Sequence, residues 1–136
     1  MTNSSLARSY LVKAGHRLKV LAVLFEDGAH SDVVREAQEV VELALKGMLR
    51  QVGVEPPRWH DVGQLLDEHR TRFVSQVVEA LPRLMDASGW LRKEREFAFY
   101  GDIDFIPTER YSQADAARAI EEARFAVEMA ALVIPA

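Results

Sequence analysis

Apolar residues recur every three or four positions along most of the chain, which is the spacing of residues on one face of an α-helix. This spacing predicts helices over residues 4–27, 32–52, from 60 or 61 onward, 75–99 and 113–134, with a loop over 101–109. No segment alternates between apolar and polar residues for long enough to predict a strand. The pattern therefore predicts an all-α fold, an antiparallel up-and-down bundle of four to five helices in a single domain over residues 1–136.

Residues with special backbone properties mark the ends of these helices. Gly28 and Gly53 are placed to adopt the left-handed conformation that ends a helix. Ser31 and Ser112 each precede a helical pattern, so they are expected to cap the second and the last helix. Pro82 lies inside the 75–99 segment and predicts either a kink or a later start, because proline lacks the amide donor of the helical ladder.

Composition narrows the class of protein without identifying it. The 136 residues are 49% hydrophobic and 28% charged, which is typical of a globular domain. Cysteine is absent, which excludes disulfides and thiolate chemistry. No apolar run approaches the roughly 20 residues of a membrane span, and residues 1–5 do not resemble a signal peptide. We therefore expect a cytoplasmic protein that has no membrane partner.

Charge and motifs exclude several kinds of site. The net charge of −4 disfavours broad binding to nucleic acid, which needs an extended basic surface. The densest basic stretch, residues 83–95, is interrupted by acidic residues, so a solvated helix face is its simpler interpretation. The sequence has no phosphate-binding loop, no HExxH metal pair and no GxSxG elbow. Its histidines are scattered, so neither a metal nor a cofactor is predicted.

The second predicted helix carries the first candidate site. Gln38, Glu42 and Lys46 stand four residues apart and form one polar line along it. The functional interpretation is the wall of a ligand site that offers an amide, a carboxylate and an amine. The simpler interpretation, which the spacing alone favours, is a surface ion pair between Glu42 and Lys46, contributing a few tenths of a kcal/mol.

A second candidate line lies near the end of the 75–99 helix. Arg92, Glu96 and Tyr100 fall four residues apart, and Arg95 and Phe99 form a neighbouring line. An arginine here could hold a phosphate through its planar guanidinium group. The same residues could equally form a structural network that fixes the loop after residue 101.

Two further candidates lie at predicted helix starts. His60 and Asp61 precede the third helix, where a histidine could bind an anion together with free helix amides. Capping the helix, or packing beside Trp59, is the simpler interpretation. Arg110 and Tyr111 precede the last helix and could also hold an anion; the alternative is a surface arginine with Tyr111 packed against that helix.

Four motifs follow one another along nearly the whole chain. Residues 37–47 carry a QxxxExxxK pattern, and His60-Asp61-Val62 precedes a pair of leucines. Residues 95–102 contain an RExxFYGD run, and Ile106-Pro107 precedes Arg110-Tyr111 and an alanine-rich helix. Together and in this order, the motifs resemble those of the HEPN domain family.

The resemblance implies an up-and-down bundle of helices that is usually dimeric. It also implies nucleotide binding and, for many members, pairing with a minimal nucleotidyltransferase in toxin–antitoxin systems. Active members of the family are metal-independent ribonucleases with an Arg-x4–6-His motif. In that motif the histidine acts as general base on the ribose hydroxyl and the arginine stabilises the charged phosphorane.

The ribonuclease motif is incomplete in this chain. Arg110 matches the family's arginine, but residues 115–117 are Asp, Ala and Ala, without a histidine. Asp115 lies in the first turn of the last helix, where the helix dipole favours the charged, weakly basic carboxylate. We therefore expect ribonuclease activity of the usual kind to be absent or very weak, with Arg110 and His60 as the remaining catalytic candidates.

Three functions follow from these observations. The leading hypothesis is a dimeric nucleotide-binding or partner module of a nucleotidyltransferase-linked system. Its ligand-binding residues are expected among Gln38, Glu42, Lys46, His60, Asp61, Arg92, Arg95, Glu96, Tyr100, Arg110 and Tyr111. One alternative is an active ribonuclease with a non-standard base, such as His60 brought to Arg110 by the fold or across a dimer. The other is a purely structural dimer.

Overall fold

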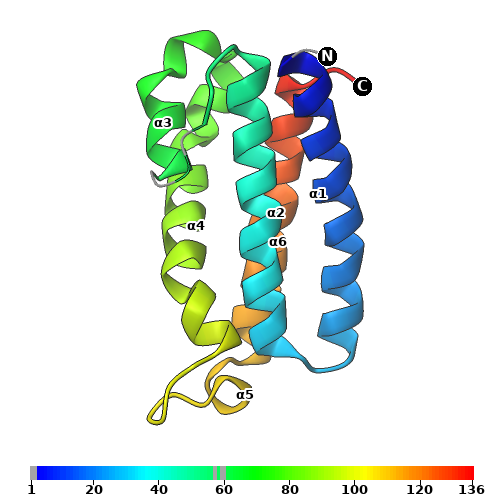
Figure 1. Cartoon of the computed structure of the whole chain (residues 1–136), viewed down its shortest axis with the longest axis vertical. Coiled ribbons are helices and arrows are strands. Elements are labelled where there is room, and N and C mark those ends of the chain that lie inside the picture. Colours follow the sequence, from blue (N-terminus) through cyan, green and yellow to red (C-terminus); the bar gives the residue numbers. More distant parts are fainter. Residues whose placement is uncertain (1–2, 57, 59–60) are drawn as a thin grey trace.

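A computed structural model of the chain describes residues 3–56, 58 and 61–136 (Figure 1). Its elements in chain order are α1 (Asn3–Glu26), α2 (His30–Gln51), α3 (Val62–Glu68), the 3-10 turn η1 (Arg70–Arg72), α4 (Ser75–Phe99), α5 (Pro107–Arg110) and α6 (Gln113–Val133). Within these ranges the only β-type pairing is an isolated bridge between Asp102 and Phe105. The predicted all-α helical bundle is confirmed.

Helix α2 lies at the centre of the bundle and packs against α1, α4 and α6. In Figure 1 it runs between α1 and α4, with α6 behind it. The short helices lie at different ends, with α3 beside the upper half of α4 and α5 below the lower end of the bundle. None of the helices in the described ranges combines the length and apolar character that crossing a bilayer requires.

The core forms because α2 carries apolar residues on nearly every side. Its fully covered residues include Val33, Val34, Ala37, Val40, Ala44, Leu45, Met48 and Leu49. Burying one valine, leucine or methionine side chain stabilises the fold by about 1.5–3 kcal/mol. Helix α6 meets this core with a row of buried alanines, whose small side chains allow close approach: Ala116, Ala119, Ala123, Ala126 and Ala130.

Helix ends follow the sequence predictions in most places. Gly28 and Gly53 have φ angles of 74° and 86°, in the predicted left-handed region. Ser112 caps α6 in a capping box, where its hydroxyl accepts from the Asp115 amide at 3.1 Å and the Asp115 carboxylate accepts from the Ser112 amide at 2.9 Å. The prediction for Ser31 is wrong. Helix α2 already begins at His30, so Ser31 lies inside it and is buried.

The segment that was predicted to be a loop over 101–109 contains the four-residue helix α5. Pro107 begins this helix, because the fixed φ of proline suits the first helical position and its missing amide costs nothing there. Gly101, at φ 66°, turns the chain out of α4. A Cβ at this residue would lie 2.3 Å from the Phe105 carbonyl oxygen, so only glycine fits the turn.

The 75–99 helix runs unbroken through Pro82, which is exposed. Proline removes one hydrogen bond of the helical ladder. The neighbouring residues Val77, Leu81 and Leu84 are buried in the core, and their packing stabilises the helix on both sides of the defect.

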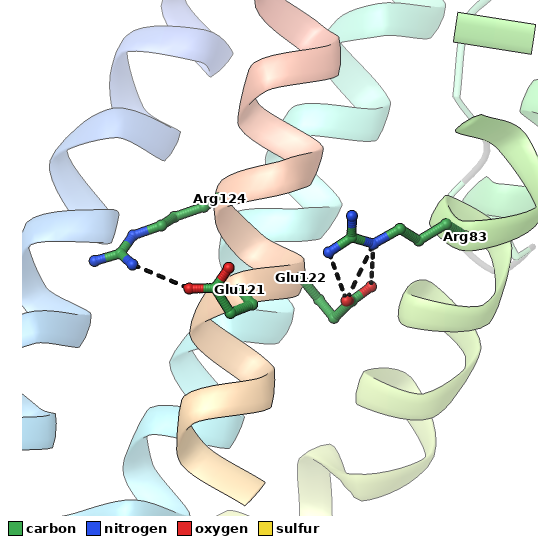
Figure 2. A network of polar contacts seen from close by, with 4 residues as sticks. All are labelled: Arg83, Glu121, Glu122 and Arg124. Carbon is green, nitrogen blue, oxygen red and sulfur yellow. Dashed lines mark hydrogen bonds and ion pairs between the residues drawn. The ribbon is translucent and has the colours of Figure 1, made fainter. Parts of the chain in front are cut away.

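A polar contact links α4 to α6 on the surface. Figure 2 shows the Arg83 guanidinium facing the Glu122 carboxylate, with N–O distances of 3.0, 3.2 and 3.4 Å. The same guanidinium carbon lies 3.9 Å from the centre of the Phe125 ring. Arg83 therefore combines a bidentate ion pair with a cation–π contact across two helices that are far apart in sequence.

We expect Arg83→Ala to lower the free energy of unfolding by about 1–2 kcal/mol, because both contacts are lost together. Arg124→Ala is the matched control. Arg124 pairs with Glu121 on its own helix at 3.3 Å, and both side chains are more than half exposed. The control should change the free energy by less than about 0.5 kcal/mol. Urea denaturation measures both values, and equal effects would show that the α4–α6 link contributes nothing of its own.

Candidate functional site

A groove of about 430 Å³ lies along the seam between α2 and α4. Its lining residues are Gln38, Glu42, Arg58, Arg92, Lys93, Arg95, Glu96 and Phe97. Two separate lines of the sequence meet here. Gln38 and Glu42 stand one turn apart on α2, and Arg92 and Glu96 stand one turn apart on α4, so each helix presents a polar edge to the other.

Gln38 is the residue that the fold itself does not explain. It is only 2% exposed, yet within the described part of the chain its Oε1 has no hydrogen-bond partner. On one side of Gln38 is a packed layer that contains Val41 and Leu91. On its other side is the open groove. A buried amide oxygen without a partner costs about 1–3 kcal/mol, so a donor supplied from the groove would recover that free energy.

The cations of the groove are held by weak pairs. Arg95 Nη2 lies 3.4 Å from Glu39 Oε1, and Arg92 Nη1 lies 3.8 Å from Asp61 Oδ1. These side chains are a quarter to a half exposed, where an ion pair contributes about 0–1 kcal/mol. Lys93 has no ion-pair partner among the described residues. An anionic ligand can therefore bind these cationic groups and break their existing ion pairs with little loss of free energy.

A second hollow of about 660 Å³ adjoins the groove, and we call it the α1–α2 pocket. It is lined by Tyr10, Lys46, Arg50, Glu55, Pro56 and Arg58. Lys46, which the sequence placed in one line with Gln38 and Glu42, belongs to this pocket rather than to the groove. Arg58 lines both hollows.

Several lining residues were not selected from the sequence. Arg50 continues the four-residue spacing of Lys46 on α2, and extending that line by one turn would have found it. Lys93 was interpreted as part of a solvated face. Tyr10 and Arg58 come from α1 and from the segment before α3, and no local pattern connects them with α2.

Asp61 caps α3, which was the simpler of its two interpretations. Its Oδ1 accepts a hydrogen bond from the Gly63 amide at 3.0 Å. The same oxygen lies near Arg92 at the edge of the groove. The predictions for His60 and Trp59 lie outside the described residues.

Tyr100, Arg110 and Tyr111 do not line the groove. Tyr100 is 77% exposed and touches Phe99, with 4.7 Å between ring centres. The Arg110 guanidinium stacks over the Phe105 ring at 4.6 Å, and the Tyr111 ring packs edge-on against the same ring, with 5.7 Å between ring centres. The Tyr100 amide donates to the Glu96 carbonyl oxygen at 2.8 Å, as part of the end of α4. Among the described residues no side-chain hydrogen bond or ion pair joins Tyr100 to Arg92 or Glu96, so the three side chains do not form one network.

The position where the family's histidine would stand is occupied by structural residues. Asp115 is held in the capping box of α6, Ala116 is buried, and Ala117 is exposed. Among the described histidines, His69 ends α3, and α3 and α5 lie at different ends of the bundle (Figure 1). In the same ranges, no group of three or more His, Asp or Glu side chains is close enough to hold a metal ion.

Comparison with known protein families gives a match over most of the chain. The family model described as HEPN domain matches residues 7–133, which include the groove, the adjoining pocket and the Arg110 region. No curated protein matches the chain.

The Tyr111 hydroxyl is a second unpartnered polar group. The residue is 8% exposed, and Oη has no hydrogen-bond partner among the described residues. Burial, and to a smaller extent the nearby carboxylates of Glu94 and Asp115, raise the pKa of the Tyr111 phenol to about 12 against a lowering effect of Arg110. The folded protein therefore favours the neutral phenol of Tyr111 over the charged phenolate.

We expect Tyr111→Phe to leave the free energy of unfolding unchanged at neutral pH or to raise it by up to about 1 kcal/mol, because it removes an unpartnered buried hydroxyl. The unfolded phenol ionises near pH 10, whereas the folded one keeps its proton to about pH 12. The parent protein should therefore lose stability as the pH rises through this window, and the variant should lose less. Chemical denaturation at pH 7, 10 and 11.5 measures the difference. A variant that is clearly less stable at pH 7 would contradict the assignment.

Proposed function

The chain belongs to the HEPN domain family of helical modules, and from this premise we propose that it is a nucleotide-binding module whose site is the α2–α4 groove. The family supports a function related to nucleotides or RNA, and the groove supplies groups of the required kind. Its guanidinium groups can hold phosphate oxygens in a planar, bidentate geometry.

The observation that carries this proposal is a local excess of positive charge on an acidic protein. The linings of the groove and the α1–α2 pocket together contain six cationic residues and three carboxylates, whereas the whole chain has a net charge of −4. Cations remain in excess when Glu39 and Asp61, which pair with Arg95 and Arg92 at the edge of the groove, are counted as well. The remaining surface is therefore strongly acidic and repels anions. A concave site of opposite sign attracts an anionic ligand and orients it.

The base of a nucleotide has two partners in the groove. The Phe97 ring packs against Phe105, with 5.2 Å between ring centres, and the residue is still 45% exposed, so its open side can stack on a base. The Gln38 amide can meet the polar edge of the base, and a ring N–H or amino group would supply the donor that Oε1 lacks. Together with the cations, these groups can recognise a base and a phosphate in one site.

The Gln38→Met variant tests the site without removing a stabilising contact. Because the Gln38 oxygen has no partner, the variant should be as stable as the parent or more stable in the absence of ligand. Its affinity for ATP should fall about tenfold, which is about 1.4 kcal/mol. Calorimetric titration measures the affinity and thermal unfolding measures the stability.

Two further variants complete this experiment. Gln76→Met changes an exposed glutamine in the first turn of α4 and should leave the affinity unchanged. Arg95→Ala removes a groove cation and should weaken ATP binding. The proposal fails if the parent protein binds no nucleotide, or if Gln38→Met binds ATP as tightly as the parent.

The assembly that we propose is a homodimer that acts as a partner of a nucleotidyltransferase in a system of the toxin–antitoxin type. HEPN domains commonly dimerise. A candidate contact surface is the lower end of the bundle, where exposed apolar side chains gather at the end of α4 and in the following segment: Phe99, Tyr100, Ile103 and Ile106. Large exposed apolar residues in such a cluster are typical of a protein interface.

We propose in addition that the protein lacks the metal-independent ribonuclease activity of the family. Arg110 has a stacking partner rather than an imidazole, and Asp115 is committed to the helix cap. Incubation with single-stranded RNA in EDTA should give no cleavage, and Arg110→Ala should not change the result. Light scattering on the same sample measures the molar mass of the protein and so shows whether it is a dimer. Cleavage that Arg110→Ala and His60→Ala both abolish would establish the active ribonuclease instead.

A further inference from the structure

We infer that the α1–α2 pocket is a second phosphate subsite, which makes the protein select ligands with a chain of phosphates over nucleoside monophosphates. The residues that would hold the distal phosphates are Lys46, Arg50 and Arg58, with Tyr10 beside them. This inference rests on the proposed nucleotide site in the α2–α4 groove and names the ligand class of that site.

The pocket and the groove are neighbours that share one lining residue. Arg58 lines both of them. Glu42 of the groove and Lys46 of the pocket are one helical turn apart, with 3.7 Å between Nζ and Oε1. Gln38 and Arg50 stand at the two ends of this polar line on α2, roughly 18 Å apart along the helix axis at 1.5 Å per residue. A base, a ribose and an extended chain of phosphates can cover such a span, whereas a nucleoside monophosphate leaves the far end empty.

Arg50 is held in place without being neutralised. Its Nη1 donates to Asn3 Oδ1 at 3.3 Å, and its guanidinium lies over the Tyr10 ring at 5.9 Å. Its Nε is buried without a hydrogen-bond partner in the described part of the chain, and no carboxylate there pairs with it. A fixed arginine with unused donors binds phosphate oxygens with little loss of side-chain entropy.

The other charges of the pocket also favour an anion. Arg58 is exposed and has no ion-pair partner among the described residues, and Glu55 is the only acidic residue in the lining. The walls are mainly polar, so the pocket suits a hydrated, charged group better than an apolar one. Three cations around one hollow fit the closely spaced charges of adjacent phosphates.

Glu42 opposes this binding. Its carboxylate pairs with Lys46 and lies at the junction that the phosphates must pass. Neutralising it would release Lys46 and remove a negative charge next to the ligand. The site therefore contains one residue whose replacement should strengthen binding, an outcome that damage to the fold does not produce.

The test is a calorimetric titration of AMP, ADP, ATP and inorganic tripolyphosphate into the full chain at low salt. The parent protein should bind ATP at least about tenfold more tightly than AMP. Arg50→Gln should reduce this ratio to about threefold or less and leave the AMP affinity unchanged. Glu42→Gln should tighten ATP binding by about threefold to tenfold. Arg124→Gln, on α6 and outside both hollows, is the control and should behave as the parent does.

The outcomes separate this inference from the proposed function. Equal affinities for AMP and ATP, with no effect of Arg50→Gln, overturn the second subsite and leave the nucleotide site in place. Binding of tripolyphosphate that depends on Arg50, with no binding of any nucleotide, supports the subsite and overturns the nucleotide site. If neither tripolyphosphate nor a nucleotide binds, both are wrong. ATP affinity that falls in Glu42→Gln also contradicts the inference, whatever Arg50→Gln shows.

Discussion

The burial of α2 on three sides is the constraint on which the rest of the structure depends. Helices α1, α4 and α6 all pack against it, and among its residues only Asp32 is fully exposed. Its polar side chains consequently have few places to reach solvent. Glu42 and Lys46 reach it along the seam with α4 and the adjoining pocket, whereas Gln38 stays buried and its amide oxygen has no partner among the described residues. The site is thus a consequence of how the central helix is covered.

The same arrangement separates charge on the molecule. Cations from α2, from α4 and from the segment before α3 collect around two neighbouring hollows, while the chain as a whole is acidic. The ion pairs that hold them are long and partly exposed, so they stabilise the fold little and can yield to a ligand. At the lower end of the bundle, by contrast, Arg110 and Tyr111 both pack against the Phe105 ring. Arg110 and Tyr111 therefore lie outside the groove, although Phe97 of the groove packs against Phe105, with 5.2 Å between ring centres.

Local patterns in the sequence were sufficient for the helices and most of their ends. The period of the apolar residues predicted the four long helices, and Ser112 and the glycines at 28 and 53 marked ends that the structure confirms. These features depend on interactions within a few residues, which a sequence pattern records directly. The prediction for Ser31 failed because helix α2 begins before this residue, which lies buried inside it. At Pro82 the later of the two predicted helix starts is excluded, because the helix continues through the proline and the packing of its buried neighbours outweighs one missing hydrogen bond.

The sequence by itself determined which polar residues share one edge of a helix, since spacing within a helix decides that. It placed Gln38 in line with Glu42, and Arg92 in line with Glu96, but not the two lines opposite each other. Only the tertiary structure decided that they face each other, that Arg58 joins them, and that Tyr100 and Arg110 do not. The physical reason is that the pairing of distant helices depends on how whole apolar faces pack, a property of the complete core that no short segment contains.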